Sequence, residues 1–114
     1  MKKTAKKIDK QLRESLTQVC EYSLEQYNGF QWLTHTVNYA NFPKSLKIIC
    51  IFDTEQNLKA LLQSNAQLEL NKQIQAALFK INITLPNATS QISYDSEEKC
   101  QQTHNGNWAS RLGQ

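Results

Sequence analysis

The sequence predicts an α+β fold in which helices pack on one face of a three-stranded, largely antiparallel sheet. Three observations carry this prediction: an amphipathic stretch at residues 5–26, a run of large apolar and β-branched residues at 46–52, and a second helical stretch at 54–80. Apolar residues three and four apart indicate a helix that buries one face, whereas a short continuous apolar run indicates a buried strand. Two alternating segments complete the order α-β-β-α-α-β.

The first helix is expected over residues 5–26. Its apolar stripe recurs at steps of three and four and comprises Ile8, Leu12, Leu16, Val19, Cys20, Leu24 and Tyr27. Asn28 and Gly29 follow this stripe and tolerate left-handed backbone, which is typical of a helix end.

Two strands are expected next, joined by a short link at residues 41–45. Side chains alternate over residues 32–39, with Leu33, His35, Val37 and Tyr39 on one side and the residues between them on the other. The strand at 46–52 follows the link, which is short enough for an antiparallel pair.

The stretch at 54–80 is expected to form two helices. Asp53 or Thr54 caps the first, and Asp53 with Gln56 resembles a capping box. Ser64 and Asn65 are expected to break the stretch. Alternation from Ala88 to Tyr94 predicts the last strand.

The chain is expected to form one domain at residues 1–96, followed by a polar C-terminal tail at 97–114 that Trp108 partly orders. The predicted core consists of Leu12, Leu16, Val19, Leu33, Val37, Ile48, Cys50, Phe52, Leu58, Leu62, Ile74, Leu78 and Ile92.

Charge is unevenly distributed along the chain. The net charge is +3, but residues 1–13 hold six basic side chains against Asp9 alone, a balance of +5, and the remainder balances at −2. Cations at a helix N-terminus oppose the helix dipole, so they do not serve helix formation. They either keep a solvated helix start soluble or meet a partner such as nucleic acid, anionic lipid or an acidic protein face. The candidate nucleic-acid-binding residues are Lys2, Lys3, Lys6, Lys7, Lys10, Arg13, Lys44 and Lys47.

The sequence predicts no membrane segment and no cofactor. Neither an apolar signal core after Met1 nor a run of about 18 apolar residues is present. Cys20, Cys50 and Cys100 are odd in number and lack the C-x-x-C spacing, so Cys20 and Cys50 are expected to be core thiols. The expected location is the cytoplasm.

Signals for catalysis are weak, and the protein is expected not to be an enzyme. The three glycines form no phosphate-binding loop. His35 and Cys50 on neighbouring strands form either a metal or nucleophile pair or, as is more usual for an apolar strand face, part of the core. Asp95, Glu97 and Glu98 follow the last strand and are either ligand groups or a solvated loop.

Aromatic residues lie near the basic residues in the sequence. Phe30, Trp32, Tyr39 and Phe42 surround the first strand and its link. Aromatic side chains beside lysine and arginine are a common way to hold single-stranded nucleic acid, although the same residues also serve to complete a core.

Two resemblances bear on function. The order of elements over residues 5–96, ending in the segment 92–96, resembles the KH-like arrangement of the ribosome-binding factor A family, although the G-x-x-G clamp of ordinary KH domains is absent. The segments at 29–35, 37–47, 52–54, 94–95 with 97–98, and 106–108 are similar to a family of short bacterial proteins labelled Fis-family transcriptional regulators. This second resemblance implies DNA binding and control of transcription.

Together these features predict a non-enzymatic nucleic-acid-binding or ribosome-associated accessory or regulatory protein that uses its basic N-terminal helix. The alternative is a protein-interaction module that does not bind nucleic acid. RNA, DNA or a protein is therefore the expected partner, and the sequence leaves the oligomeric state open.

Overall fold

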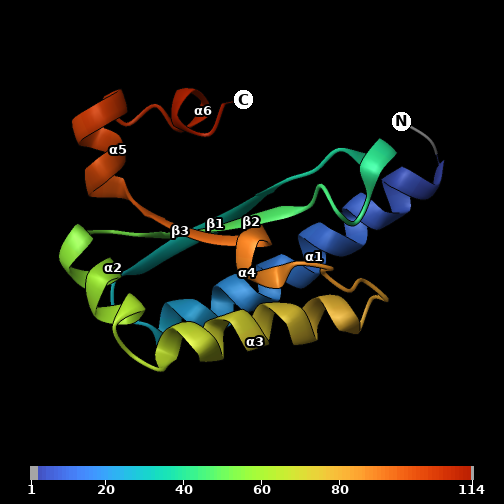
Figure 1. The fold of residues 1–114 in the computed structure, drawn as a ribbon, viewed down its shortest axis with the longest axis horizontal. Helices are drawn as coiled ribbons and strands as arrows, with labels where there is room; N and C mark the ends of the chain where they lie inside the picture. Colours follow the sequence, from blue (N-terminus) through green and yellow to red (C-terminus); the bar gives the residue numbers. More distant parts are fainter. Residues whose placement is uncertain (1–2, 114) are drawn as a thin grey trace.

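The computed structural model describes residues 3–113 and confirms the α+β class and the order of the main elements (Figure 1). The helices are α1 (Lys3–Gln26), α2 (Glu55–Leu62), α3 (Ala66–Phe79), α4 (Ala88–Gln91), α5 (Glu97–His104) and α6 (Trp108–Arg111), with a 3-10 turn η1 (Tyr39–Asn41). The strands are β1 (Phe30–Thr36), β2 (Lys47–Phe52) and β3 (Ile92–Ser96).

The sheet is mixed, so the expectation of a largely antiparallel sheet is wrong in this respect. The strands lie in the order β1-β2-β3; β1 and β2 are antiparallel, whereas β2 and β3 are parallel. The reason is the connection. The chain leaves β2, passes through α2 and α3, and returns to the end of the sheet at which β2 begins, so β3 must run in the direction of β2.

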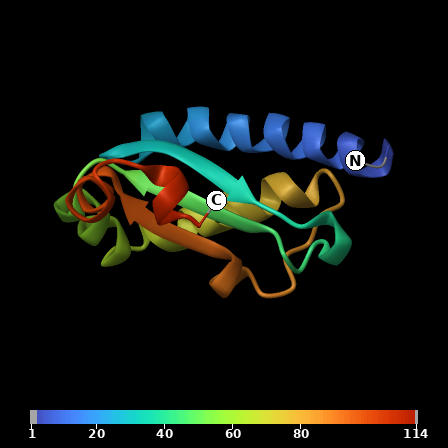
Figure 2. The same ribbon diagram turned by 90° about the horizontal axis from the view of Figure 1, so that it is seen from above.

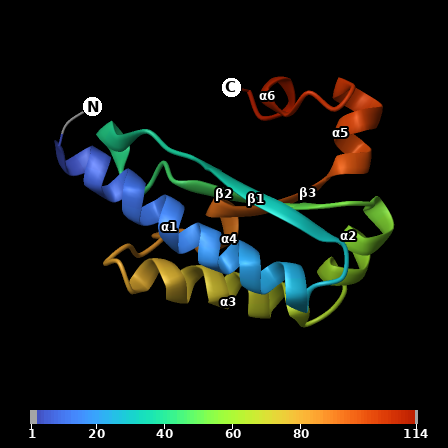
Figure 3. The same cartoon turned by 180° about the vertical axis from the view of Figure 1, so that it is seen from behind.

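Two long helices cover one face of the sheet. Figures 1 and 3 show α1 and α3 side by side beneath the strands. Two hydrogen bonds show that the helices run antiparallel: the Ser15 hydroxyl donates to the Ala77 carbonyl at 3.2 Å, and the Tyr22 hydroxyl donates to Glu69 at 3.4 Å. The core between these layers includes the fully buried side chains of Leu12, Ile48, Cys50, Phe52, Leu70, Ile74 and Leu78.

Ten of the thirteen expected core residues are buried, and Leu62 is a clear error. Leu33 and Val37 are partly buried against the core, whereas Leu62 is 42% exposed and Leu61 is buried in its place. Around the helix axis, Leu61 and Leu62 lie at similar angles on opposite sides of Leu58. The 3.6-residue period of the helix therefore does not distinguish which of the two is buried. The contacts of α2 with the rest of the fold decide which leucine is buried.

The segment 88–91 forms the helical turn α4, so the expectation of a strand beginning at Ala88 is wrong. The buried Gln91 explains the difference. Its Oε1 accepts from the Asn87 backbone N–H at 2.8 Å, and its Nε2 donates to the carbonyls of Pro43 and Leu46 at 3.0 and 2.9 Å. A buried amide with its hydrogen bonds made stabilises this turn, and alternation of side chains does not report such bonds.

The C-terminal residues add cover on the other face. The Trp108 ring of α6 packs edge-to-face on Trp32 of β1, with centroids 5.1 Å apart, and Arg111 binds Asp95 of β3. Both partners flank Ile51, which is fully buried on that face. Of the helices in residues 3–113, none combines the length and apolar character of a membrane span.

Candidate functional site

The predicted basic residues of α1 lie on the exposed first half of this helix. Lys3, Lys6, Lys7, Lys10 and Arg13 are all exposed. Lys2 lies outside the described residues. The helix carries no acidic residue in its first turn, so nothing there offsets the charge of Lys3 and Lys6.

Two of these cations are engaged locally. The Arg13 guanidinium binds Asp9 at 3.0 Å, and the Lys10 ammonium lies 4.0 Å from Glu14. Asp9 also accepts a hydrogen bond from the Tyr39 hydroxyl at 3.0 Å, which ties the η1 segment to this part of α1. Within residues 3–113, the remaining predicted cations form no ion pair.

Lys44 and Lys47 lie at the same end of the molecule as the first half of α1. In Figure 1 the η1 segment, the start of α1 and the end of α3 gather at one end of the long axis. Lys47 pairs with Thr36 across β1 and β2, next to Ile48 on the core face. Successive strand residues point to opposite faces, so Lys47 points away from α1. The structure therefore places Lys47 at the same end of the molecule as the α1 cations but on the opposite face of the sheet.

The end of α3 contributes a cation that was not predicted. Lys80 is exposed and lines a small cavity of about 250 Å³ with Gln11 and Glu14 of α1. The antiparallel packing of α1 and α3 brings it there, so no local sequence signal pointed to it.

Charge is consequently segregated along the molecule. One end, named here the basic end, holds Lys3, Lys6, Lys7, Lys10, Arg13, Lys44, Lys47 and Lys80. These eight cations face only Asp9 and Glu14, a balance of +6, whereas the rest of residues 3–113 carries eight carboxylates against four cations, a balance of −4. The longest extent of the molecule is 41 Å, several times the roughly 8 Å screening length at physiological salt, so the two ends act as separate fields.

Two of the four predicted aromatic residues lie at the basic end. Tyr39 and Phe42 are half-buried and pack against each other, with ring centroids 5.6 Å apart. Burial, together with the hydrogen bond to Asp9, raises the pKa of Tyr39 to about 12. Phe30 and Trp32 do not join them: Phe30 packs on Phe52 in the core, and Trp32 packs on Trp108.

An open groove of about 510 Å³ runs between α1 and β1. Leu16, Cys20 and Leu33 form much of its apolar lining, and Arg13, Glu21 and His35 add charged and polar groups. Burial lowers the pKa of His35, and Arg13 acts in the same direction while Asp9 opposes it. Imidazole with a pKa below its usual value of about 6.5 is neutral at pH 7.

His35 and Cys50 do not form a directly facing pair. His35 pairs with Ile48, and Cys50 pairs with Leu33. Cys50 is fully buried, and burial raises the pKa of its thiol to about 12, so it is a core thiol rather than a nucleophile. Cys20 is the cysteine that shares the groove with His35. Within residues 3–113, no three His, Cys, Asp or Glu side chains gather in a way that could hold a metal ion.

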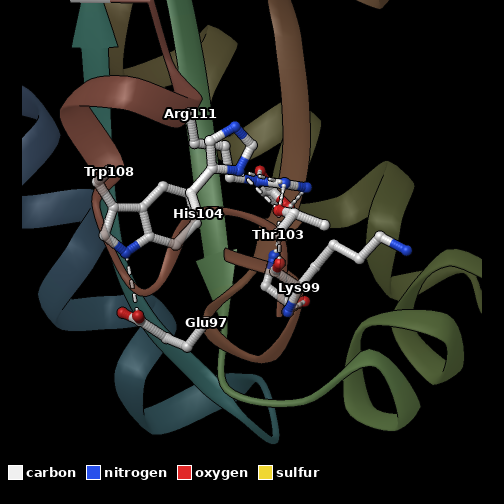
Figure 4. Close-up of polar contacts among 8 residues, drawn as sticks. Glu97, Lys99, Thr103, His104, Trp108 and Arg111 are labelled. Carbon is white, nitrogen blue, oxygen red and sulfur yellow. Dashed lines mark hydrogen bonds and ion pairs between the residues drawn. The ribbon is translucent and has the colours of Figure 1, made fainter. Parts of the chain in front are cut away.

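The acidic residues near the end of β3 and at the start of α5 are engaged in structural hydrogen bonds. Arg111 binds Asp95 through two nitrogens, at 2.6 and 2.9 Å, and donates to the Thr103 hydroxyl at 2.6 Å (Figure 4). Glu97 accepts the indole N–H of Trp32 at 2.5 Å and that of Trp108 at 3.0 Å.

Glu98 completes this set by accepting the backbone N–H of Glu55 at 2.9 Å, at the start of α2. The solvated-loop interpretation of these residues is therefore wrong for Asp95 and Glu97, which are half-buried. The available signal was Trp108 and Arg111, an indole and a guanidinium spaced three apart in an otherwise polar segment.

No protein-family model matches the chain, and no curated protein or solved structure is significantly similar to it. The resemblances to ribosome-binding factor A and to the Fis-labelled family therefore stay predictions.

Proposed function

We propose that this protein is a non-enzymatic nucleic-acid-binding protein that holds the phosphate backbone of RNA or DNA with its basic end. The observation that carries the proposal is the segregation of charge, with exposed cations from α1, the η1–β2 connection and α3 gathered at one end. A concentrated positive field steers polyanions and releases their counterions on binding.

The half-buried pair of Tyr39 and Phe42 supports the same proposal. It lies beside the cations of α1, to which the hydrogen bond from Tyr39 to Asp9 connects it. Aromatic rings beside lysines serve as stacking partners for unpaired bases. A role as a ribosome-associated or regulatory accessory protein is consistent with this chemistry, because such proteins engage structured RNA or DNA mainly through the backbone.

The salt dependence of binding tests the proposal. A 20-nucleotide single-stranded RNA and a 20-base-pair DNA duplex, each labelled with fluorescein, are titrated by anisotropy between about 50 and 200 mM salt. If about six cations contact phosphates of the duplex, log K should fall against log salt with a slope of about −5.

A charge-matched pair of variants separates site from total charge. The variant Lys3→Gln/Lys6→Gln/Lys7→Gln removes three cations of the basic end, and Lys59→Gln/Lys72→Gln/Lys99→Gln removes three exposed cations elsewhere. The first should reduce the magnitude of the duplex slope by about 2.7, whereas the second should leave it nearly unchanged. Equal effects of the two variants, or no binding by the wild-type protein at about 50 mM salt, would refute the proposal.

A protein-interaction module is the second candidate function. The observation that favours it is the open groove between α1 and β1, which has an apolar lining and lies beside a free strand edge.

A further inference from the structure

Strand β1 forms a free edge of the sheet, with α1 packed beside it. It lies at one end of the order β1-β2-β3 and is the longest strand, with seven residues. It contains neither proline nor any charged residue, which are two of the usual means of blocking an exposed edge. Its residues from Trp32 to Thr36 are half-buried rather than covered.

The opposite edge of the sheet is protected. Strand β3 has five residues and is bounded directly by α4 and α5. It also carries Asp95, which Arg111 binds. The lack of such features at β1 is therefore specific to that edge and is not a property of the whole sheet.

The groove beside β1 has the position that an added strand requires. Figures 2 and 3 show α1 running alongside β1 at the outer margin of the fold. A strand hydrogen-bonded to β1 would lie about 4.8 Å beyond it, above the groove lined by Leu16, Cys20 and Leu33. Alternate side chains of that strand would point into the groove.

We propose that the groove between α1 and β1 binds an extended peptide, which adds to β1 as an antiparallel fourth strand. Main-chain hydrogen bonds to Trp32–Thr36 would supply affinity, and small apolar side chains at alternate positions would fill the groove. The register shift between Phe30 and Trp32 limits the paired length at the other end of β1.

The charges at the two ends of the groove define the peptide further. The last part of β1 lies near the first half of α1, because Tyr39 reaches Asp9. Arg13, whose Nε donates to Asp9 at 3.0 Å, lines the groove at this end. Glu21 lies nearer the end at which α1 leads into β1. An antiparallel peptide would therefore carry an acidic residue near its N-terminus, facing Arg13, and a basic residue near its C-terminus, facing Glu21.

A second copy of the chain fits this edge less well than a free peptide. Figure 2 shows α1 lying outside β1 on the side from which a new strand would approach. The β1 strand of a second copy would bring its own α1 into the same space, so the two helices would collide. A peptide without a flanking helix avoids this collision.

The probe for the test is the acetylated and amidated peptide Asp-Thr-Val-Thr-Val-Thr-Lys, in which the Asp, both Val and the Lys side chains share one face. It is titrated against the full-length wild-type chain. Binding is followed by amide chemical shifts, which should change along β1 and the facing side of α1 with a Kd of about 1 mM or tighter. Two derivatives carry N-methyl groups on alternate residues, one on each edge of the peptide. Only one edge faces β1, so one derivative should lose at least about tenfold in affinity and the other should retain it.

A matched pair of protein variants locates the site. Thr17→Trp places an indole in the groove and should lower affinity at least about tenfold, whereas Gln18→Trp places it on the α3 side of α1 and should not. Lack of binding by the parent peptide, equal effects of the two N-methylated peptides, or equal effects of the two variants would overturn the proposal. A wild-type dimer that Thr17→Trp dissociates, measured by light scattering, would also overturn it by identifying a second copy as the occupant.

Discussion

Replacing Gly29 by alanine should destabilise the protein strongly, because this glycine joins α1 to β1 under two constraints. Its φ is +84°, a conformation that costs an L-residue about 1–2 kcal/mol. A Cβ atom there would lie 2.6 Å from both the Asn57 Cβ and the Asp53 Oδ1. Asp53 Oδ1 accepts from the Thr54 N–H and the Asn57 amide, and displacing it would weaken two hydrogen bonds worth about 1 kcal/mol or more each. The expected loss for Gly29→Ala is therefore about 3–5 kcal/mol.

The other two glycines provide graded controls for this substitution. Gly106 also has a positive φ, of +78°, but its Cβ would meet only the flexible end of Gln101 at 2.8 Å. Gly113 has a φ of +73°, and nothing lies within 4 Å of its Cβ position. Urea unfolding followed by circular dichroism should rank the losses Gly29→Ala, then Gly106→Ala at about 1–2 kcal/mol, then Gly113→Ala. A loss for Gly29→Ala no larger than that for Gly106→Ala would refute the steric reasoning.

Three further predictions concern single side chains. Burial lowers the pKa of His35 in the folded state, so the unfolded chain takes up a proton first as the pH falls. The free energy of unfolding, measured with urea, should therefore be smaller at about pH 5.5 than at about pH 7.5, and His35→Gln should reduce this difference. Glu97→Gln should loosen residues 97–113, because the Glu97 carboxylate accepts two indole N–H groups and an amide has only one oxygen to replace its two. Limited proteolysis of this variant should be faster than that of the wild type, whereas the exposed control Glu25→Gln should be cleaved at the wild-type rate. Leu61→Ala should lower the free energy of unfolding by about 2–4 kcal/mol, and Leu62→Ala by less than about 1 kcal/mol; equal losses would contradict the burial assignment.

The candidate basic site was predictable only in part. The cations of α1 cluster in the sequence, so composition alone pointed to them. Lys80 joins them because α1 and α3 run antiparallel, and Lys47 points to the other face because of its strand register. These two placements depend on contacts between distant segments, about which charge patterns carry no information.

The C-terminal segment illustrates the same limit for the fold. Its polar composition predicted a polar tail that Trp108 partly orders. In the structure, residues 97–113 contain two helices connected to the sheet through Glu97 and Arg111. Each of these side chains is polar and would be solvated in isolation. Their pairing with Trp32 and Asp95 replaces water with directed, charge-assisted hydrogen bonds, and this pairing is decided by tertiary structure.

By itself, the sequence determined those elements in which the spacing of apolar residues agrees with the side chains that the fold buries, and the turn at Gly29. The stripe of α1, the apolar run of β2 and the turn at Gly29 each follow from periodicity or backbone freedom within a few residues. Only the tertiary structure decided the direction of β3, the choice between Leu61 and Leu62, and the open edge of β1. The physical reason is that these features depend on where the chain returns after α3 and on which surfaces then meet, and side-chain periodicity is the same in either outcome.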